Sequence, residues 1–167
     1  NYDFKTTESL FMNIYSLLEP STIFADLDVV DKDDLLERMI NVLSGQVNEE
    51  QLQQMREAVF EREQIMSTGV GKSLAIPHGK VPSIEKNYAS FALLKNPIDY
   101  DSIDEKPVHI VFLLVGPEKK DTIHIKLLSR ISRLMNSNTF RETLMECHTP
   151  EEIHDAFKKE ELRYFGN

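Results

Sequence analysis

The sequence predicts an α/β fold: a single layered domain in which helices flank a mixed β-sheet. Two observations carry this prediction. Apolar residues recur at helical spacing in both end regions of the chain, whereas short apolar runs bounded by Gly, Pro, Asn or Asp occupy the middle. The chain has 167 residues, 41% of them hydrophobic, and neither a repeat nor a Pro/Gly-rich linker divides it. We therefore expect one domain over residues 1–167.

Two helices are predicted near the beginning of the chain. Apolar residues recur at helical spacing over residues 10–18, and Pro20 then breaks the pattern. Asp31 is the expected N-cap of the next helix, which runs through Leu43. Gly45 is expected to end that helix in a left-handed conformation.

A third helix and three strands follow. Asn48 and Gln51 form a capping-box pattern that opens a helix running toward Arg62 and stopping before Ser67. The strands are predicted as buried because each is a short, continuous apolar run. These runs cover residues 74–76, 89–94 and 108–115.

Helical spacing returns in the last third of the chain. One helix is predicted from Asp121, which is the expected cap, through Met135, and a second over residues 140–145. A third begins at Thr149, an N-cap residue followed by Pro150 at the first helical position and an acid two residues later. Helices on both sides of a central group of strands favour a mixed sheet in a layered domain.

Composition excludes several classes of function. The net charge of −9 argues against a broad nucleic-acid surface, which needs clustered Lys and Arg. No apolar run approaches the ~18 residues of a membrane helix, so we expect no membrane insertion and a cytoplasmic protein. The single cysteine, Cys147, cannot form an internal disulfide or a thiolate zinc site. We therefore expect no structural metal and no cofactor.

The charge is unevenly distributed. Residues 1–59 hold 12 acids and 4 bases, whereas residues 60–80 hold 2 acids and 3 bases. A second basic stretch lies over residues 119–141, where six Lys and Arg residues accompany Asp121 as the one acid. Such a run is either a solvated helix face or one side of an anion site, and both interpretations stay open at this point.

A nucleotide-binding interpretation fails on spacing. Gly69 to Ser73 reads GVGKS, which resembles part of a phosphate-binding loop. A Walker A loop requires Gly where Met66 stands, and a dinucleotide fingerprint requires Gly where Leu74 stands. The patterns of hydrolases and metalloenzymes, such as Gly-x-Ser-x-Gly and His-x-x-x-His, do not occur either.

His78 is the leading candidate for chemistry. It follows the strand-like residues 74–77 and precedes Gly79, so we expect its imidazole where a strand leaves the sheet and the backbone turns. The carboxyl ends of strands are where α/β sheets bind ligands. A turn residue without chemistry is the alternative interpretation for a single imidazole.

Possible anion ligands lie just before His78. Arg62 offers a planar cation whose donors match phosphate oxygens. Hydroxyls and backbone amides add uncharged donors, at Ser67, Thr68, Gly69 and Gly71. Together with His78 these groups predict an anion site.

His124 is the second candidate. It falls in the first turn of the helix expected from Asp121, on the core-facing side, where the helix dipole favours an anion and disfavours a protonated imidazole. A buried histidine satisfied by a carbonyl is the equally weighted alternative. His109, His148 and His154 are interpreted as structural or solvent-facing.

The segment from Ser67 to Gly79, STGVGKSLAIPHG, resembles the active-site segment of the fructose/mannitol-type enzyme IIA domains of the bacterial sugar phosphotransferase system. Arg62 before it and His124 after it match the family's Arg and second His. The resemblance extends over nearly the whole chain. One departure is Ser73, which stands where many members have Gly.

This resemblance implies a phosphocarrier without metal or cofactor. His78 would accept a phosphoryl group on Nε2 from the phosphohistidine of HPr and pass it to a IIB domain. Arg62 would neutralise phosphoryl oxygens, His124 would position them, and the donors at 67–71 would assist. The alternative is a nitrogen-regulatory IIA module whose phosphorylation state controls binding to partner proteins. A relative that has lost phosphorylation is disfavoured because all three matching residues are present.

Overall fold

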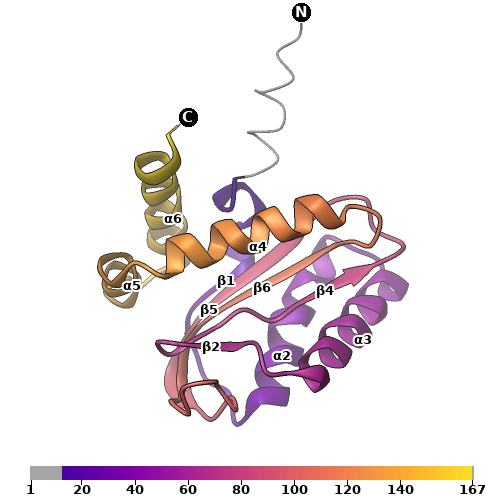
Figure 1. The fold of residues 1–167 in the computed structure, drawn as a ribbon, viewed down its shortest axis with the longest axis horizontal. Helices are drawn as coiled ribbons and strands as arrows, with labels where there is room; N and C mark the ends of the chain where they lie inside the picture. The colour runs from indigo at the N-terminus through magenta and orange to yellow at the C-terminus, as the bar shows by residue number, and fades with distance from the viewer. Residues whose placement is uncertain (1–12, 167) are drawn as a thin grey trace, which may run out of the picture.

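The structure is a computed structural model that describes residues 13–166, and it confirms an α/β fold with a mixed sheet (Figure 1). The α-helices of these residues are α2 (Lys32–Asn41), α3 (Glu49–Ile65), α4 (Asp121–Met135), α5 (Asn138–Met145) and α6 (Pro150–Phe165). The strands are β1 (Ile23–Leu27), β2 (Gly69–Gly71), β3 (Leu74–Ala75), β4 (His78–Val81), β5 (Tyr88–Ile98) and β6 (Val108–Pro117). Short 3-10 helices are η1 (Tyr15–Leu17), η2 (Pro20–Thr22) and η3 (Val42–Gly45).

Strand β6 is the centre of the sheet. It pairs antiparallel with β5, which in turn pairs parallel with the edge strand β1. On its other side β6 pairs parallel first with β3 and then, further along, with β4. Strand β2 continues the sheet as the antiparallel partner of β3. The segment between β3 and β4 is therefore a short break in one edge of a continuous sheet.

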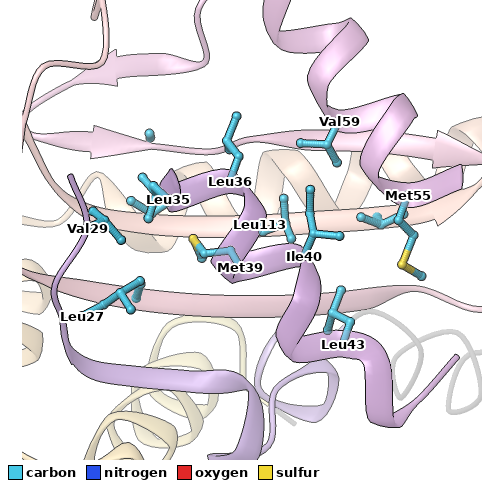
Figure 2. Packing of buried hydrophobic residues seen from close by; sticks show 14 of the residues in the cluster. Leu27, Val29, Leu35, Leu36, Met39, Ile40, Leu43, Met55, Val59 and Leu113 are labelled. Atoms are coloured by element: carbon cyan, nitrogen blue, oxygen red, sulfur yellow. The ribbon is translucent and has the colours of Figure 1, made fainter. Parts of the chain in front are cut away.

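The helices cover the sheet on two faces. Helices α2 and α3 lie on one face and α4 crosses the other, with α5 and α6 (Figure 1). Alternate residues of β6 enter the two cores because successive side chains of a strand point to opposite faces. Val111, Leu113 and Val115 pack with α2 and α3, as Figure 2 shows for Leu113, whereas Ile110, Phe112 and Leu114 pack with α4, α5 and α6.

Three predicted helix starts are confirmed. Asp31 Oδ1 accepts a hydrogen bond from the backbone N–H of Asp34 at 2.9 Å. The Asn48–Gln51 capping box is reciprocal, with bonds of 2.8 and 3.1 Å. The Thr149 hydroxyl accepts from a backbone N–H of the first turn of α6 at 3.1 Å. Each cap satisfies a donor that the first helical turn leaves free.

Three local predictions are wrong. Within the described part of the predicted helix 10–18, the chain forms only the 3-10 turn Tyr15–Leu17, and residues 10–12 lie outside the described residues. Gly45 does not adopt a left-handed conformation, because α2 continues directly into η3. Asp121 does not cap α4: it is the first helical residue, and its carboxylate pairs with Lys80 at 2.8 Å.

The prediction also missed β1, β2 and β4. The criterion of a continuous apolar run finds strands that are buried on both faces, as β5 and β6 largely are. In β1 only the two end residues are buried, and β4 alternates buried and more exposed positions over four residues. Short edge strands of this kind lack the pattern that was sought.

Candidate functional site

The position of His78 differs from the predicted strand end. The chain leaves the sheet at Ile76 and Pro77, and His78 re-enters it as the first residue of β4, opposite Leu114 of β6. Pro77 interrupts the strand because it has no N–H to give to the ladder. His78 thus stands at a break in the sheet edge, with Leu114 on the face covered by α4.

Gly79 serves close packing and not a turn. A Cβ at this position would lie 3.0 Å from Ala58 Cβ and 3.1 Å from the backbone of α3. Only a residue without a side chain allows α3 to approach β4 this closely. Since Arg62 lies in the last turn of α3, this contact brings its guanidinium to the His78 end of β4.

The imidazole of His78 is held in one tautomer. Its Nδ1 lies 2.8 Å from the carbonyl oxygen of Ile76, and because a carbonyl only accepts, Nδ1 carries the hydrogen. The pKa of His78 is lowered, mainly by burial and further by Arg62 and Lys80, with Ile76 and Glu63 opposing. The neutral ring therefore leaves Nε2 with a free lone pair near neutral pH.

A cavity of about 610 Å³ joins most of the predicted site residues. Arg62, Ser67, Thr68, Gly69 and His78 all line it. The rest of its wall comes from the α3–β2 junction, the loop after β5 and α4, at Met66, Val70, Ile76, Asp101, Ile103, Leu128 and Ser132. Three of these side chains are strongly exposed, namely Met66, Val70 and Ile103. The cavity therefore has a polar end beside His78 and an apolar rim.

Gly71 lies outside that cavity. It has φ of +94°, and with Lys72 and Ser73 at +57° and +61° it forms the tight hairpin between β2 and β3. Two consecutive positive φ values are typical of the mirror-image turns that match strand twist. Ser73 thus adopts a left-handed conformation that glycine accommodates with the least strain. Gly71 lines a neighbouring hollow of about 430 Å³.

Arg62 is anchored beside the cavity. Its Nη1 donates to the carbonyl oxygen of Met66 at 2.8 Å, which satisfies a backbone acceptor just beyond the end of α3. A guanidinium carries five N–H donors in a rigid fork. This single bond fixes the side chain and leaves other donors of the fork for a ligand.

The hydroxyls of Ser67 and Thr68 are directed at protein acceptors. Ser67 Oγ donates to the carbonyl oxygen of Tyr100 at 2.8 Å and accepts from the Gly69 amide at 3.1 Å. Thr68 Oγ1 donates to Glu63 at 2.5 Å. In this state both hydroxyls shape the loop, and their role as phosphoryl ligands stays a prediction.

A buried polar cluster behind the loop escaped the sequence analysis. Glu63 Oε1 lies 2.8 Å from Lys32 Nζ and accepts from the Thr68 amide at 2.9 Å. The Tyr100 hydroxyl bonds Thr68 Oγ1 at 3.1 Å, and the Lys32 ammonium lies 4.3 Å from the Tyr100 ring centroid. Burial, with the adjacent Glu63 carboxylate, raises the pKa of Tyr100, so its hydroxyl stays protonated. We call Lys32, Glu63, Thr68 and Tyr100 the Glu63 cluster.

The helical periodicity of α3 could have predicted that Glu63 is buried. Met55, Val59 and Glu63 recur every four residues along α3 and are its buried residues. The same spacing that identified the apolar face therefore also places a carboxylate on it. No comparable sequence signal marks Lys32 or Tyr100, which reach the cluster through the tertiary fold.

His124 lies close to His78 and faces the core side as predicted. The two ring centroids are 5.8 Å apart, and His124 is only 5% exposed. Neither ring nitrogen has a hydrogen-bond partner among the described residues, so no carbonyl satisfies it. Burial, with His78 and Lys80 acting in the same direction, lowers the pKa of His124 to about 4. The ring is therefore neutral at pH 7, with unused hydrogen-bonding capacity beside His78.

The second basic stretch does not reach this cavity. None of its Lys and Arg residues lines the wall beside His78. Arg130 instead pairs with the buried Glu161 at 2.9 Å and lies over the Phe165 ring, and Arg141 Nη1 donates to the Met135 carbonyl at 2.6 Å. Arg133 lines the neighbouring hollow together with Lys72, so the two basic stretches meet away from His78, and an anion site between them stays a prediction.

The remaining histidines lie elsewhere. His109 is half-buried in β6 and lines a separate hollow. His154 Nε2 bonds the carbonyl oxygen of Tyr15 at 2.9 Å, and His148 is exposed. Between residues 13 and 166, no group of three or more His, Cys, Asp and Glu side chains is arranged to hold a metal ion. Within the same range no helix has the length and apolar character needed to cross a bilayer.

Solved structures first define the class of protein. The nitrogen regulatory protein IIA-Ntr from Neisseria meningitidis has a TM-score of 0.79 with 29% identity, covering 86% of this chain and 98% of that one. IIA mannitol from Escherichia coli has a TM-score of 0.69 with 19% identity, covering 84% and 98%, and supports the fold alone. The fold is that of phosphotransferase-system IIA proteins.

The chain belongs to the family "Phosphoenolpyruvate-dependent sugar phosphotransferase system, EIIA 2", which matches residues 16–160. The "PTS system fructose-specific EIIABC component" of Bacillus subtilis is 33% identical over 150 residues, covering 89% of this chain but only 23% of that protein. A "Nitrogen regulatory protein" of Bradyrhizobium diazoefficiens is 34% identical over 145 residues, covering 87% and 94%. The relatives of this chain thus include both a fructose-specific phosphotransferase-system component and nitrogen regulatory proteins.

Proposed function

We propose that this chain is a cytoplasmic histidine phosphocarrier, which accepts a phosphoryl group on His78 from phospho-HPr or an HPr-like carrier and passes it to a IIB domain. The observation that carries the proposal is the tautomer of His78. Its Nδ1 is engaged by Ile76, so the nucleophilic lone pair is on Nε2, in a ring that lines the same cavity as Arg62. Membership in the IIA family supports it.

The chemistry requires no cofactor. The Nε2 lone pair of His78 attacks phosphorus, the P–N bond to the donor imidazole breaks, and its electron pair returns to that nitrogen. In the onward step a nucleophile of the acceptor attacks phosphorus, the P–Nε2 bond to His78 breaks, and its electron pair returns to Nε2. Such transfers depend on positioning and on neutralising charge on the phosphoryl oxygens. The Arg62 fork suits that charge, and His124 is close enough to take part.

A IIB acceptor is supported by a fold neighbour. A complex of enzyme IIA mannitol with phosphorylated enzyme IIB mannitol from Escherichia coli has a TM-score of 0.70 at 18% identity with this chain. In our proposal the exposed apolar side chains of Met66, Val70 and Ile103 around the cavity are suited to a protein partner, since solvent-exposed apolar clusters are typical of interaction surfaces.

A regulatory role is the second candidate. One observation favours it: the nitrogen regulatory protein IIA-Ntr from Neisseria meningitidis has a TM-score of 0.79 at 29% identity with this chain, against 0.69 at 19% for IIA mannitol. In that role the His78 chemistry is the same, but the phosphorylation state would control binding to a partner protein instead of feeding a IIB domain.

Labelling with radioactive phosphoenolpyruvate, enzyme I and HPr tests the proposal. The parent protein should become labelled in a 1:1 ratio, and His78→Ala should not be labelled. His109→Ala is a matched control because it changes a half-buried histidine of the same sheet away from the cavity. Stoichiometric label on His78→Ala, placed on another residue by mass spectrometry, would contradict the proposal. Onward transfer to a IIB domain then separates the transport role from the regulatory one.

A further inference from the structure

The imidazole ring of His124 lies against β6 at Gly116, a residue without a side chain. A Cβ at Gly116 would stand 2.8 Å from His124 Nδ1 and 2.5 Å from Asn87 Oδ1. A residue with a side chain would therefore displace one or both groups. The absence of a side chain at Gly116 lets the imidazole from α4 and the amide from the start of β5 approach the same point.

Strand register explains why Asn87 reaches this point. Tyr88 of β5 pairs with Val115, so Asn87, one residue earlier, falls opposite Gly116. On the other side of β6, Gly116 pairs with Lys80. Lys80 is already engaged, because its ammonium donates to Asp121 at 2.8 Å. Of the two side chains that flank Gly116, the amide of Asn87 is the one available to His124.

Three polar atoms at this place have no partner. They are Asn87 Oδ1, His124 Nδ1 and His124 Nε2, and all three are buried. Leaving buried polar atoms unpaired is costly, and such groups are paired in the great majority of cases. Rotating the Asn87 amide by half a turn exchanges its oxygen and nitrogen with little change in shape. The Nδ2 donor, and not Oδ1, then faces the point at Gly116 that His124 Nδ1 also approaches.

A donor at Nδ1 determines the tautomer of the ring. A neutral imidazole carries one hydrogen, so a ring that accepts at Nδ1 must carry the hydrogen on Nε2. The pKa of His124 near 4 keeps the ring in this neutral form. His78 has the opposite arrangement, with the hydrogen on Nδ1 and the lone pair on Nε2. With a donor at His124 Nδ1, the two neighbouring histidines have complementary tautomers, His78 with a lone pair on Nε2 and His124 with a hydrogen there.

We infer that Asn87 is a positioning residue: its side-chain amide donates to His124 Nδ1 and thereby presents the Nε2–H of His124 as a hydrogen-bond donor toward a phosphoryl group on His78. This inference rests on the proposed function for its consequence, but the tautomer itself exists without phosphoryl transfer. Gly116 is the residue that makes the contact possible.

Long-range ¹H–¹⁵N NMR of the imidazole rings at pH 8 tests the inference directly. In the parent protein we expect His124 to show a protonated Nε2 and an unprotonated Nδ1. Asn87→Asp keeps the shape but offers only an acceptor, so His124 should change to the Nδ1–H tautomer. Asn136→Asp, at the other end of α4, is the control and should leave the spectrum unchanged. Asn87→Ser serves as a second variant, with a hydroxyl that can donate and so retain the parent tautomer.

Transfer from phospho-HPr is the second readout. Losing one oriented donor at a transferring group typically costs ~10² to 10³ in rate, and Arg62 remains, so we expect Asn87→Asp to be about 10- to 100-fold slower. An unchanged His124 tautomer in folded Asn87→Asp would overturn the inference, whatever the rate. If the parent protein takes no label on His78, the proposed function fails, whereas the NMR result still decides the role of Asn87.

Discussion

Two buried polar groups of residues flank the His78 site, and they differ in how far their hydrogen bonds are satisfied. In the Glu63 cluster both carboxylate oxygens, the Thr68 and Tyr100 hydroxyls and the Lys32 ammonium all have partners. Around His124 neither ring nitrogen is paired as the side chains are placed, and the Asn87 bond inferred above satisfies Nδ1 alone. We call His124, Asn87 and Gly116 the His124 pocket. One group is closed and holds the loop, while the other keeps hydrogen-bonding capacity for a ligand.

The closed cluster gives the site its rigidity. Glu63 is adjacent to Arg62 in α3, and it binds both the amide and the hydroxyl of Thr68 at the start of the loop. The end of α3 and the loop therefore move as one unit. A catalytic group that is fixed beforehand needs no ordering when the ligand arrives.

The largest expected loss of stability comes from removing the charge of Glu63 in the Glu63 cluster. Glu63→Gln leaves the Lys32 ammonium, only 19% exposed, without its counter-charge. Breaking a buried pair by removing one partner typically costs ~3 to 5 kcal/mol, and we expect the lower part of that range because Lys32 retains some solvent. Urea unfolding monitored by circular dichroism measures the change.

A more exposed pair, Glu37 with Arg56, provides the control for that measurement. Glu37 accepts from Arg56 at 2.9 Å, and its side chain is 40% exposed. Surface pairs contribute about 0 to 1 kcal/mol, so Glu37→Gln should have little effect. Equal losses of stability for Glu63→Gln and Glu37→Gln would show that the Glu63 cluster does not hold the loop.

The next-largest expected effect is a loss of folding stability as the pH falls. His124 has a pKa of about 4 in the folded state, against about 6.5 in an unfolded chain. Below pH 6.5 the unfolded state therefore binds a proton that the folded state does not, so His124 contributes a loss of stability that grows as pH falls. Between pH 8 and 5.5 this loss is about 1.5 kcal/mol.

Replacing His124 should remove that dependence. We expect the stability of His124→Leu, measured by urea unfolding, to fall by about 1.5 kcal/mol less than that of the parent over the same pH interval. His148→Leu changes an exposed histidine and is the control. Identical pH dependence of the parent and His124→Leu would mean that His124 is not buried as a neutral ring.

Much of the frame could be predicted from local sequence. The caps at Asp31, Asn48 and Thr149 were predictable because each involves residues only three apart. The long strands β5 and β6 were predictable because burial on both faces gives continuous apolar runs. The short β1 and β4 were not, because pairing with a neighbouring strand defines them more than their own composition does.

The candidate site divides in the same way. His78, Arg62 and His124 were recognised as a set from a motif, and the structure brings His78 into one cavity with Arg62 and within 5.8 Å of His124. The residues that hold these three side chains in place were not predicted. Lys32 of helix α2 pairs with Glu63, and Tyr100 of the loop after β5 bonds Thr68. The position of Asn87 depends on the register between β5 and β6. Contacts of that kind have no local pattern.

A smaller loss of stability is expected when one hydroxyl is removed from the Glu63 cluster. Tyr100→Phe removes one hydroxyl, while Thr68 Oγ1 keeps its bond to Glu63. A typical neutral hydrogen bond contributes about 1 kcal/mol, so we expect a loss of that size in thermal or urea unfolding. A loss as large as that of Glu63→Gln would show that the ring and not the carboxylate organises the cluster.

The smallest expected effect on stability tests the open pocket. Replacing both polar members with apolar side chains of similar size, as in the double variant Asn87→Leu with His124→Leu, removes no essential support. When both partners of a buried polar contact are replaced, the change is close to neutral, because neither leaves an unpaired group behind. At pH 8 we expect a shift within about 0.5 kcal/mol in urea unfolding, together with slower phosphoryl transfer from phospho-HPr. The single variant Thr68→Val is the contrast, since it leaves Oε2 of the buried Glu63 carboxylate without a donor and should cost about 1 to 3 kcal/mol. If the double variant lost as much stability as Thr68→Val, the His124 pocket would be a structural element like the Glu63 cluster, and the distinction between a closed and an open group would fail.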